Sequence, residues 1–177
     1  MDYKHVLAGL TSANHTRIMV SGPQRSGTTI ATKMLAEDLG FRCVLEEEFN
    51  FHDLTKLVKI VTDSNCFVIQ APTMSSICHR LQVAVVFMRR SLEDIGKSQD
   101  RIKWDHEHAE KNRYFHDGEE PIAQVKYRAW EKHQRAFLPP GSAFDLDYES
   151  LKGHRLWIDK ELRVGFRGRQ TQNDLLL

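Results

Sequence analysis

The sequence has too few cysteines for a disulfide framework or a zinc site. It contains three, Cys43, Cys66 and Cys78, an odd number without a C-x-x-C pair. All three lie in or near apolar stretches, so we expect them to be buried thiols.

Long apolar runs, internal repeats and an excess of one charge are also lacking. No window approaches the length of a transmembrane helix, and the segment before Ile18 is too short and too polar for a membrane anchor. Lys and Arg exceed Asp and Glu by only one, 25 against 24, which gives no general attraction to nucleic acid or anionic membranes. We therefore expect one cytoplasmic domain over residues 1–177, without a membrane or nucleic-acid partner, in which any anion site is local.

Apolar runs with the profile of buried strands alternate with helical patterns. The apolar runs are 18–20, 41–45, 65–70, 82–88 and 143–147. Helical spacing covers 3–10, 30–39, 51–63, 73–80, most of 91–138 with a break near 117–118, and 148–162. This alternation predicts parallel βαβ units, and hence a three-layer α/β sandwich with a central parallel sheet of about four to five strands, similar to P-loop NTPases.

The segment GPQRSGTT, Gly22 to Thr29, joins the first predicted strand to the following helix. Its glycines, Gly22 and Gly27, supply backbone freedom and close approach. Backbone N–H groups and the positive end of a helix dipole then point at one place, which suits a phosphate. The segment matches G-x-x-x-x-G-K-[ST] except at Thr28, where kinases and ATPases carry the lysine that reaches the β- and γ-phosphates. The cation of this loop is Arg25 instead.

The run Arg25-Ser26-Gly27-Thr28-Thr29 resembles the [KR]-[ST]-G-[ST]-T loop of sulfotransferases. The resemblance implies that Gly22 to Thr29 holds the 5′-phosphosulfate of the donor, 3′-phosphoadenosine 5′-phosphosulfate (PAPS). After the sulfuryl group has been transferred, the donor product is adenosine 3′,5′-bisphosphate (PAP). The resemblance also implies that Arg25 stabilises charge on the bridging oxygen as the sulfuryl group departs. The alternative is a glycine turn without a ligand.

Arg89 and Arg90 follow the strongest predicted strand, whose carboxyl end should face the ligand crevice of the sheet. Ser98 falls two turns further along the next helix, on the same side. An arginine and a serine so placed can clamp a phosphate. The pair resembles the sulfotransferase residues that bind the 3′-phosphate, with Arg90 favoured over Arg89 and Asp94 between the two. The alternative is a pair of solvated arginines that open a helix.

Two weaker matches lie near the end of the chain. Arg167-Gly168-Arg169 resembles the basic loop that closes over the same 3′-phosphate, although the tryptophan that often follows it is absent. An exposed tail without a role is the alternative. Asp147 to Leu151 resembles the Tyr-Glu-x-Leu segment of the family, and we expect it to be structural.

Sulfuryl transfer needs a general base near the loop. The resemblance implies a histidine after the third strand or a glutamate after the second, and Gln70-Ala71-Pro72 offers no histidine. The predicted base is Glu48 or Glu46, ahead of Glu47, with His52 in reserve. Alternate glutamates of an extended stretch face opposite sides, so at most two can point inward. A solvated acidic turn is the alternative.

A further group of polar and aromatic residues lies between 99 and 139, the region we expect on the acceptor side. Its members are His106, Glu107, His108, His116, Asp117, Trp104, Tyr114, Phe115 and Trp130. His106 and His108 would face different sides of a helix, which argues against a metal site. Lining of an acceptor cleft or ordinary helix packing are the remaining interpretations.

Together the sequence predicts a PAPS-dependent sulfotransferase that uses no metal and acts on a small-molecule, sugar or other hydroxyl (or amine) acceptor. A P-loop kinase that uses ATP and magnesium, or an inactive nucleotide-binding member of the fold, are the alternatives. The acceptor and the oligomeric state stay open.

Overall fold

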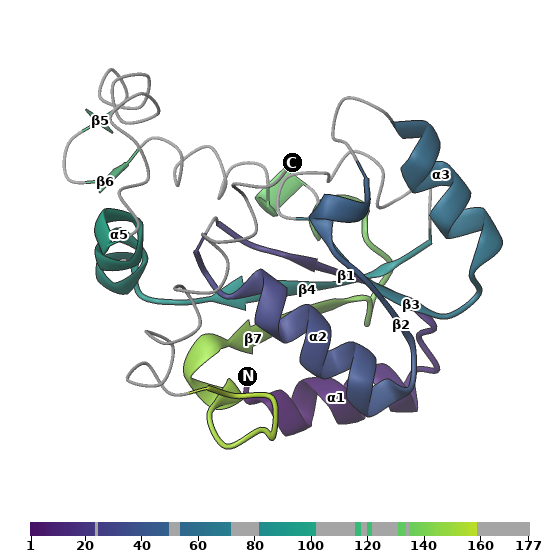
Figure 1. The fold of residues 1–177 in the computed structure, drawn as a ribbon. Helices are drawn as coiled ribbons and strands as arrows, with labels where there is room; N and C mark the ends of the chain where they lie inside the picture. The colour runs from purple at the N-terminus through teal and green to yellow at the C-terminus, as the bar shows by residue number, and fades with distance from the viewer. Residues whose placement is uncertain are drawn as a thin grey trace, which may run out of the picture.

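The structure is a computed structural model that describes residues 1–23, 25–49, 54–71, 82–101, 116–117, 120–121, 131–133 and 135–158. Five strands form its central sheet in the order β2-β3-β1-β4-β7 (Figure 1). They are β1 (Arg17–Ser21), β2 (Arg42–Val44), β3 (Phe67–Gln70), β4 (Ala84–Arg89) and β7 (Ala143–Asp147). Every neighbouring pair is parallel, so all five carboxyl ends meet at one edge of the sheet. The expected parallel α/β sheet is confirmed.

Helices cover both faces of this sheet, because successive side chains of a strand point to opposite sides. Ile18 and Val20 of β1 pack in a core with α1 (Tyr3–Ser12) and α2 (Thr28–Leu39). Met19 faces the other way, into a second core with Leu57 of α3 (Leu54–Asp63). The result is three layers, with α1 and α2 side by side on one face (Figure 1).

Local capping explains where the helices near the loop begin and end. Gly40 ends α2 in the left-handed conformation, at φ +66°, and the next residue donates from its backbone N–H to the carbonyl of Ala36. Ser91 caps the start of α5 (Leu92–Arg101): its hydroxyl oxygen accepts a hydrogen bond from the Asp94 backbone N–H, and the hydroxyl donates to the Asp94 carboxylate.

Three stretches differ from the sequence-based expectation. The glutamates 46–48 form a short 3-10 helix, η1 (Glu46–Glu48), instead of an extended segment. The residues from 148 form only a 3-10 helix, η3 (Tyr148–Leu151), and then turns as far as 156. The Ser150 hydroxyl donates to the Asp147 carbonyl and Gly153 adopts φ +88°, and both interrupt an α-helix.

The third difference lies at residues 116–121, where the sequence predicts only a break near 117–118 between helical stretches. A two-stranded antiparallel ladder forms there from β5 (His116–Asp117) and β6 (Glu120–Pro121). Cys66 is exposed in the turn before β3, so the expectation of a buried thiol is wrong for it, while Cys43 is half-buried. The predicted helix at 73–80 and Cys78 lie outside the described residues. None of the helices in the described part is long and apolar enough to cross a membrane.

Candidate functional site

The loop between β1 and α2 is a tight turn followed by a helix start without a side-chain cap. The Ser26 backbone N–H donates to the Pro23 carbonyl over 3.0 Å, which closes a four-residue turn. Arg25, the third residue of that turn, has φ +71°, and Gly27 has φ +98°. A positive φ at the third position is what a type II turn requires, and it is uncommon for a residue other than glycine. The loop therefore holds Arg25 in a strained conformation.

The first backbone donors of α2 face this loop. Ala31 makes the first helical bond to Gly27, over 3.1 Å, so the N–H groups of Thr28, Thr29 and Ile30 precede the helical ladder. Together with the helix dipole they place partial positive charge at the loop. This is the local geometry that suits a bound anion.

Both glycines of the loop are required by protein neighbours. A Cβ on Gly22 would lie 2.5 Å from Ser26 Oγ and 2.9 Å from Met88 Cβ. A Cβ on Gly27 would lie 2.4 Å from Cδ2 of the Tyr148 ring. The absence of a side chain at Gly22 and Gly27 is therefore needed for contacts within the protein itself, with Ser26, Met88 and Tyr148.

The loop and α5 enclose a cavity of about 360 Å³. Its lining contains Arg25, Gly27, Thr28, Thr29, Ile30, Arg90, Asp94, Lys97, Ser98 and Tyr148. The structure therefore brings the predicted phosphate loop and the predicted Arg90/Ser98 pair to one place. Asp94, Lys97 and Ser98 share one side of α5 because they recur at helical spacing, and Arg90 lies between the end of β4 and the start of α5. Gly22 and the fully buried Ser26 are not among the lining residues.

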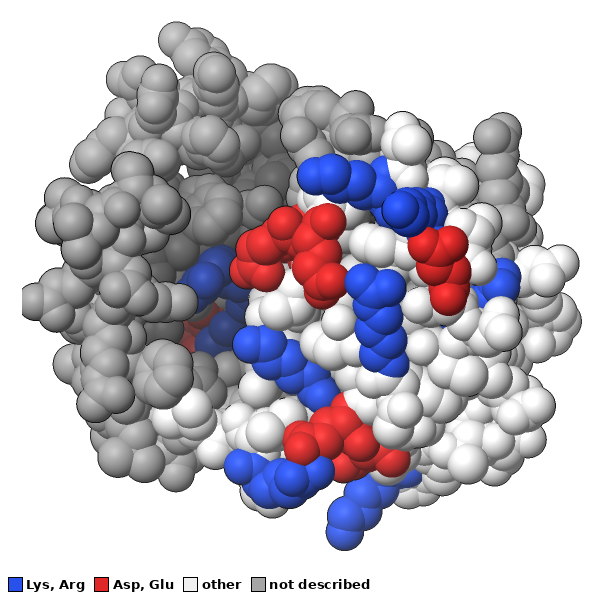
Figure 2. Space-filling model, turned by 45° about the vertical axis from the view of Figure 1, so that its right-hand side comes forward, with Lys and Arg blue, Asp and Glu red and all other residues white. Residues whose placement is uncertain are grey.

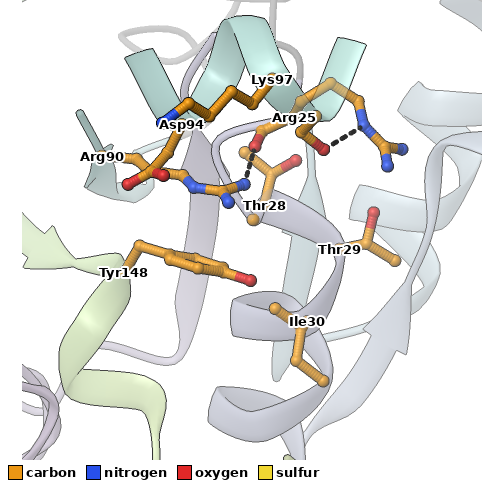
Figure 3. Close-up of a pocket in the computed structure, with 10 residues that line it drawn as sticks. Arg25, Thr28, Thr29, Ile30, Arg90, Asp94, Lys97 and Tyr148 are labelled. Atoms are coloured by element: carbon orange, nitrogen blue, oxygen red, sulfur yellow. Dashed lines mark hydrogen bonds between the residues drawn. The ribbon is translucent and has the colours of Figure 1, made fainter. Parts of the chain in front are cut away.

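Two arginines tie the loop to α5 (Figure 3). Arg90 donates from Nη1 to the Arg25 carbonyl oxygen over 2.7 Å, and its guanidinium carbon lies 4.2 Å from the centre of the Tyr148 ring. Arg25 in turn donates from Nε to Ser98 Oγ over 3.3 Å. Arg90 Nε is buried and has no hydrogen-bond partner among the described residues. The cavity thus has an arginine that still offers a donor.

Thr28 stands where the lysine of nucleotide kinases would be, and its hydroxyl lies next to the end of β3. The side-chain amide of Gln70, which is buried, donates from Nε2 to Thr28 Oγ1 over 3.4 Å. A hydroxyl oxygen that accepts from an amide keeps its own proton to donate elsewhere. Thr28 can therefore act as a neutral donor toward the cavity.

Arg89 points away from the cavity into an ion-pair network. It donates to both Glu131 and Asp145, and Arg135 donates to the same two carboxylates. Hydrogen bonds to Glu131 raise the Arg89 pKa most strongly. Burial raises the pKa of Glu131, but the hydrogen bonds from Arg89 and Arg135 outweigh it and hold that pKa below its ordinary value. The two adjacent arginines therefore have different surroundings. Arg89 belongs to the ion-pair network, and Arg90 lines the cavity.

The three glutamates after β2 are not among the residues that line the cavity. Glu48 accepts from the Leu45 backbone N–H over 3.0 Å and pairs with Arg42 over 3.3 Å, so it caps η1. Glu46 is half-buried, and burial, assisted by the charge of Glu47, raises its pKa.

Other predicted residues lie outside what the structure describes. These are His52, Arg167, Gly168, Arg169, Trp104, His106, Glu107, His108, Tyr114, Phe115 and Trp130. For His116 and Asp117 only the backbone is described. Among the described residues, no group of three or more His, Cys, Asp or Glu side chains is placed to hold a metal ion.

The structure adds Tyr148, Lys97, Asp94 and Ile30 to the site. Asp94 and Lys97 could have been found from their spacing, since they lie four and seven residues after Arg90. Tyr148 required the sheet register, because Asp147 pairs with Arg89 and so sets Tyr148 beside Arg90. Sequence reasoning had treated that tyrosine as structural.

Positive and negative side chains alternate over the outer surface, without a large patch of one sign on the described part of the face that Figure 2 shows. Figure 2 shows Lys and Arg side chains interspersed with Asp and Glu over the described part of the face it presents. Three of the four charged residues that line the cavity are cationic. Attraction of anions on this side is therefore a property of the cavity.

The sequence matches no protein-family model and no curated protein. The function must therefore be inferred from the cavity and its residues.

Proposed function

We propose that this chain is a sulfotransferase that moves a sulfuryl group from PAPS to a hydroxyl or amine acceptor. One observation supports it most: the loop at Arg25 to Thr29 and the Arg90/Ser98 pair, predicted separately as anion sites, line the same cavity. A donor with phosphate groups at both its 5′ and 3′ positions needs two such anion sites within reach of each other.

The loop residues would hold the 5′-phosphosulfate. The N–H groups at the start of α2 and the Thr28 hydroxyl supply neutral donors, and Arg25 supplies the charge. Arg25 would stabilise the transferring group electrostatically, as a fixed cation does where negative charge develops. Its strained backbone is consistent with a functional residue.

Arg90 and Ser98 would hold the 3′-phosphate. The buried Arg90 Nε and the Ser98 hydroxyl proton, which the bond from Arg25 leaves available, are donors that such a group could use. Tyr148 and the Arg25 carbonyl keep the Arg90 guanidinium in position. Because a sulfuryl group carries less charge than a terminal phosphoryl group, the proposed transfer does not require a metal ion.

Of the predicted bases in the described part of the chain, Glu48 is engaged with η1 and Arg42. We therefore take Glu46, a half-buried carboxyl outside the cavity lining, as the candidate base ahead of Glu47. The acceptor would be a small molecule, a sugar or another hydroxyl compound. Its identity depends on residues outside the described part of the chain.

The proposal is tested by following PAP release from PAPS with a panel of alcohol, phenol, sugar and amine acceptors. We expect acceptor-dependent release, and Arg25→Ala should lower kcat at least about 100-fold. Arg155→Ala is the matched control, because Arg155 is 69% exposed, pairs with Glu37 outside the cavity lining and should leave turnover unchanged. Unchanged turnover in Arg25→Ala, or transfer from ATP with magnesium instead, would contradict the proposal.

A further inference from the structure

Lys97 lies on the cavity side of α5 but is not part of the predicted donor site. It follows Arg90 by seven residues and precedes Ser98 directly, and its side chain lines the same cavity as both. Figure 3 shows Lys97 and Asp94 extending from α5 on one side of the cavity, with the first turn of α2 opposite. A cation in this place adds to the charge of Arg25 and Arg90.

Lys97 is held by a weak partner. Its amine pairs with Glu93, one helical turn earlier, and the two side chains are 68% and 76% exposed. An exposed pair of this spacing contributes little to stability because water screens both charges, so a ligand anion can displace the glutamate. The long lysine side chain has the freedom to turn from Glu93 toward the cavity.

The other charged groups of the cavity are already committed to fixed positions. Arg90 is bound to the Arg25 carbonyl and lies over the Tyr148 ring. Asp94 accepts from the Ser91 hydroxyl, so it belongs to the start of α5. Lys97 pairs with Glu93, an exposed residue that is not among the lining residues, and the charge of Asp94 also acts on its amine.

We propose that Lys97 is a third ligand-binding cation, which exchanges Glu93 for a phosphate of the donor and makes the cavity selective for nucleotides with more than one phosphate group. This inference rests on the proposed function, since it assigns a further contact to the same donor. Glu93 then acts as a competitor that the ligand replaces. Removal of Lys97 should weaken binding, and removal of the Glu93 charge should strengthen it.

The test is calorimetric titration of the full chain with PAP and, separately, with adenosine 5′-monophosphate at low ionic strength. Lys97→Met should weaken PAP binding about fivefold and change monophosphate binding less. Glu93→Gln should tighten PAP binding about twofold. In the Lys97→Met background, Glu93→Gln should have no effect, because it acts through Lys97.

A matched pair elsewhere supplies the control. Lys152 and Glu149 form a surface ion pair with 60% and 59% exposed side chains, outside the cavity lining. Lys152→Met and Glu149→Gln should leave PAP affinity unchanged. An equal loss in Lys152→Met, or an effect of Glu93→Gln that persists without Lys97, would show a general charge effect and overturn the inference.

The two proposals fail in different ways. If the wild-type chain binds no PAP, the proposed function is wrong, and Lys97 has no donor to contact. If the wild-type chain binds PAP and Lys97→Met binds it equally well, the sulfotransferase proposal stands and the role of Lys97 is overturned.

Discussion

Arg90 donates a 2.7 Å hydrogen bond from Nη1 to the carbonyl oxygen of Arg25, sixty-five residues earlier in the chain. The bond joins the end of the central strand β4 to the strained turn of the loop. Because the Tyr148 ring lies under the same guanidinium, the position of Arg90 is set from two sides. The loop and the residue that follows β4 are therefore fixed to one another as one structural unit.

Arg90→Lys tests this unit. Lysine keeps the charge and one donor for the Arg25 carbonyl, but it lacks the planar guanidinium with its further donors. We expect PAP affinity to fall about tenfold and adenosine 5′-monophosphate affinity to change much less, as seen by calorimetry. An equal loss for both nucleotides would remove the assignment of Arg90 to the 3′-phosphate.

Gly27→Ala should destabilise the fold. The new methyl group would meet the Tyr148 ring at 2.4 Å, and the backbone has φ +98°. Strain and overpacking together should lower the free energy of unfolding by about 3 kcal/mol in urea denaturation.

The control for this change is Gly153→Ala. Gly153 has a similar φ of +88°, but a Cβ there would meet nothing within 4 Å. Gly153→Ala should lower the free energy of unfolding only by the cost of a positive φ at a residue with a side chain, about 1 kcal/mol. Equal losses in the two variants would mean that the Tyr148 contact does not constrain Gly27.

Glu131 should make stability depend on pH in the acid range. Its folded-state pKa is lowered, so it contributes stability that is complete above the unfolded pKa of about 4.3 and is lost as pH falls through the lower folded value. Glu131→Gln should be less stable by about 2 kcal/mol at pH 7, and the difference should narrow toward pH 3. Denaturation at several pH values measures this, with the exposed Glu149→Gln as a neutral reference. If the difference in unfolding free energy between wild type and Glu131→Gln stays constant with pH, the ionised Glu131 does not stabilise the fold through its ion pairs.

Glu46 gives a kinetic prediction. A base must be deprotonated, so kcat/KM should fall as pH drops below a pKa that lies above the ordinary glutamate value, because burial raises it. Glu46→Gln should lose at least about 100-fold in kcat, whereas Glu48→Gln should lose stability through η1 but keep most of its activity. Full activity in Glu46→Gln would exclude it as the base.

Much of the fold followed from the sequence because the strands are continuous apolar runs. Val85, Val86 and Phe87 are buried on both faces of β4, as such a run predicts. The order of strand and helix patterns placed Arg90 just after the central strand and Ser98 on the helix that follows it. These features depend on short-range order, which sequence patterns report well.

The parts that sequence reasoning missed depend on contacts between distant segments. Tyr148 reaches Gly27 and Arg90 only through the pairing of β7 with β4. The Glu48 carboxylate accepts a hydrogen bond from the Leu45 backbone N–H and so caps a 3-10 helix. The sequence analysis had predicted an extended segment there. Neither arrangement has a periodic signal in the sequence.

The measurement that tests the central claim most directly is calorimetric titration with PAP and with ADP, each with and without magnesium. We predict tight binding of PAP that does not depend on magnesium, and weak binding of ADP. Preference for ADP with magnesium would assign the cavity to a kinase, and binding of neither nucleotide would contradict a donor site at Arg25 and Arg90.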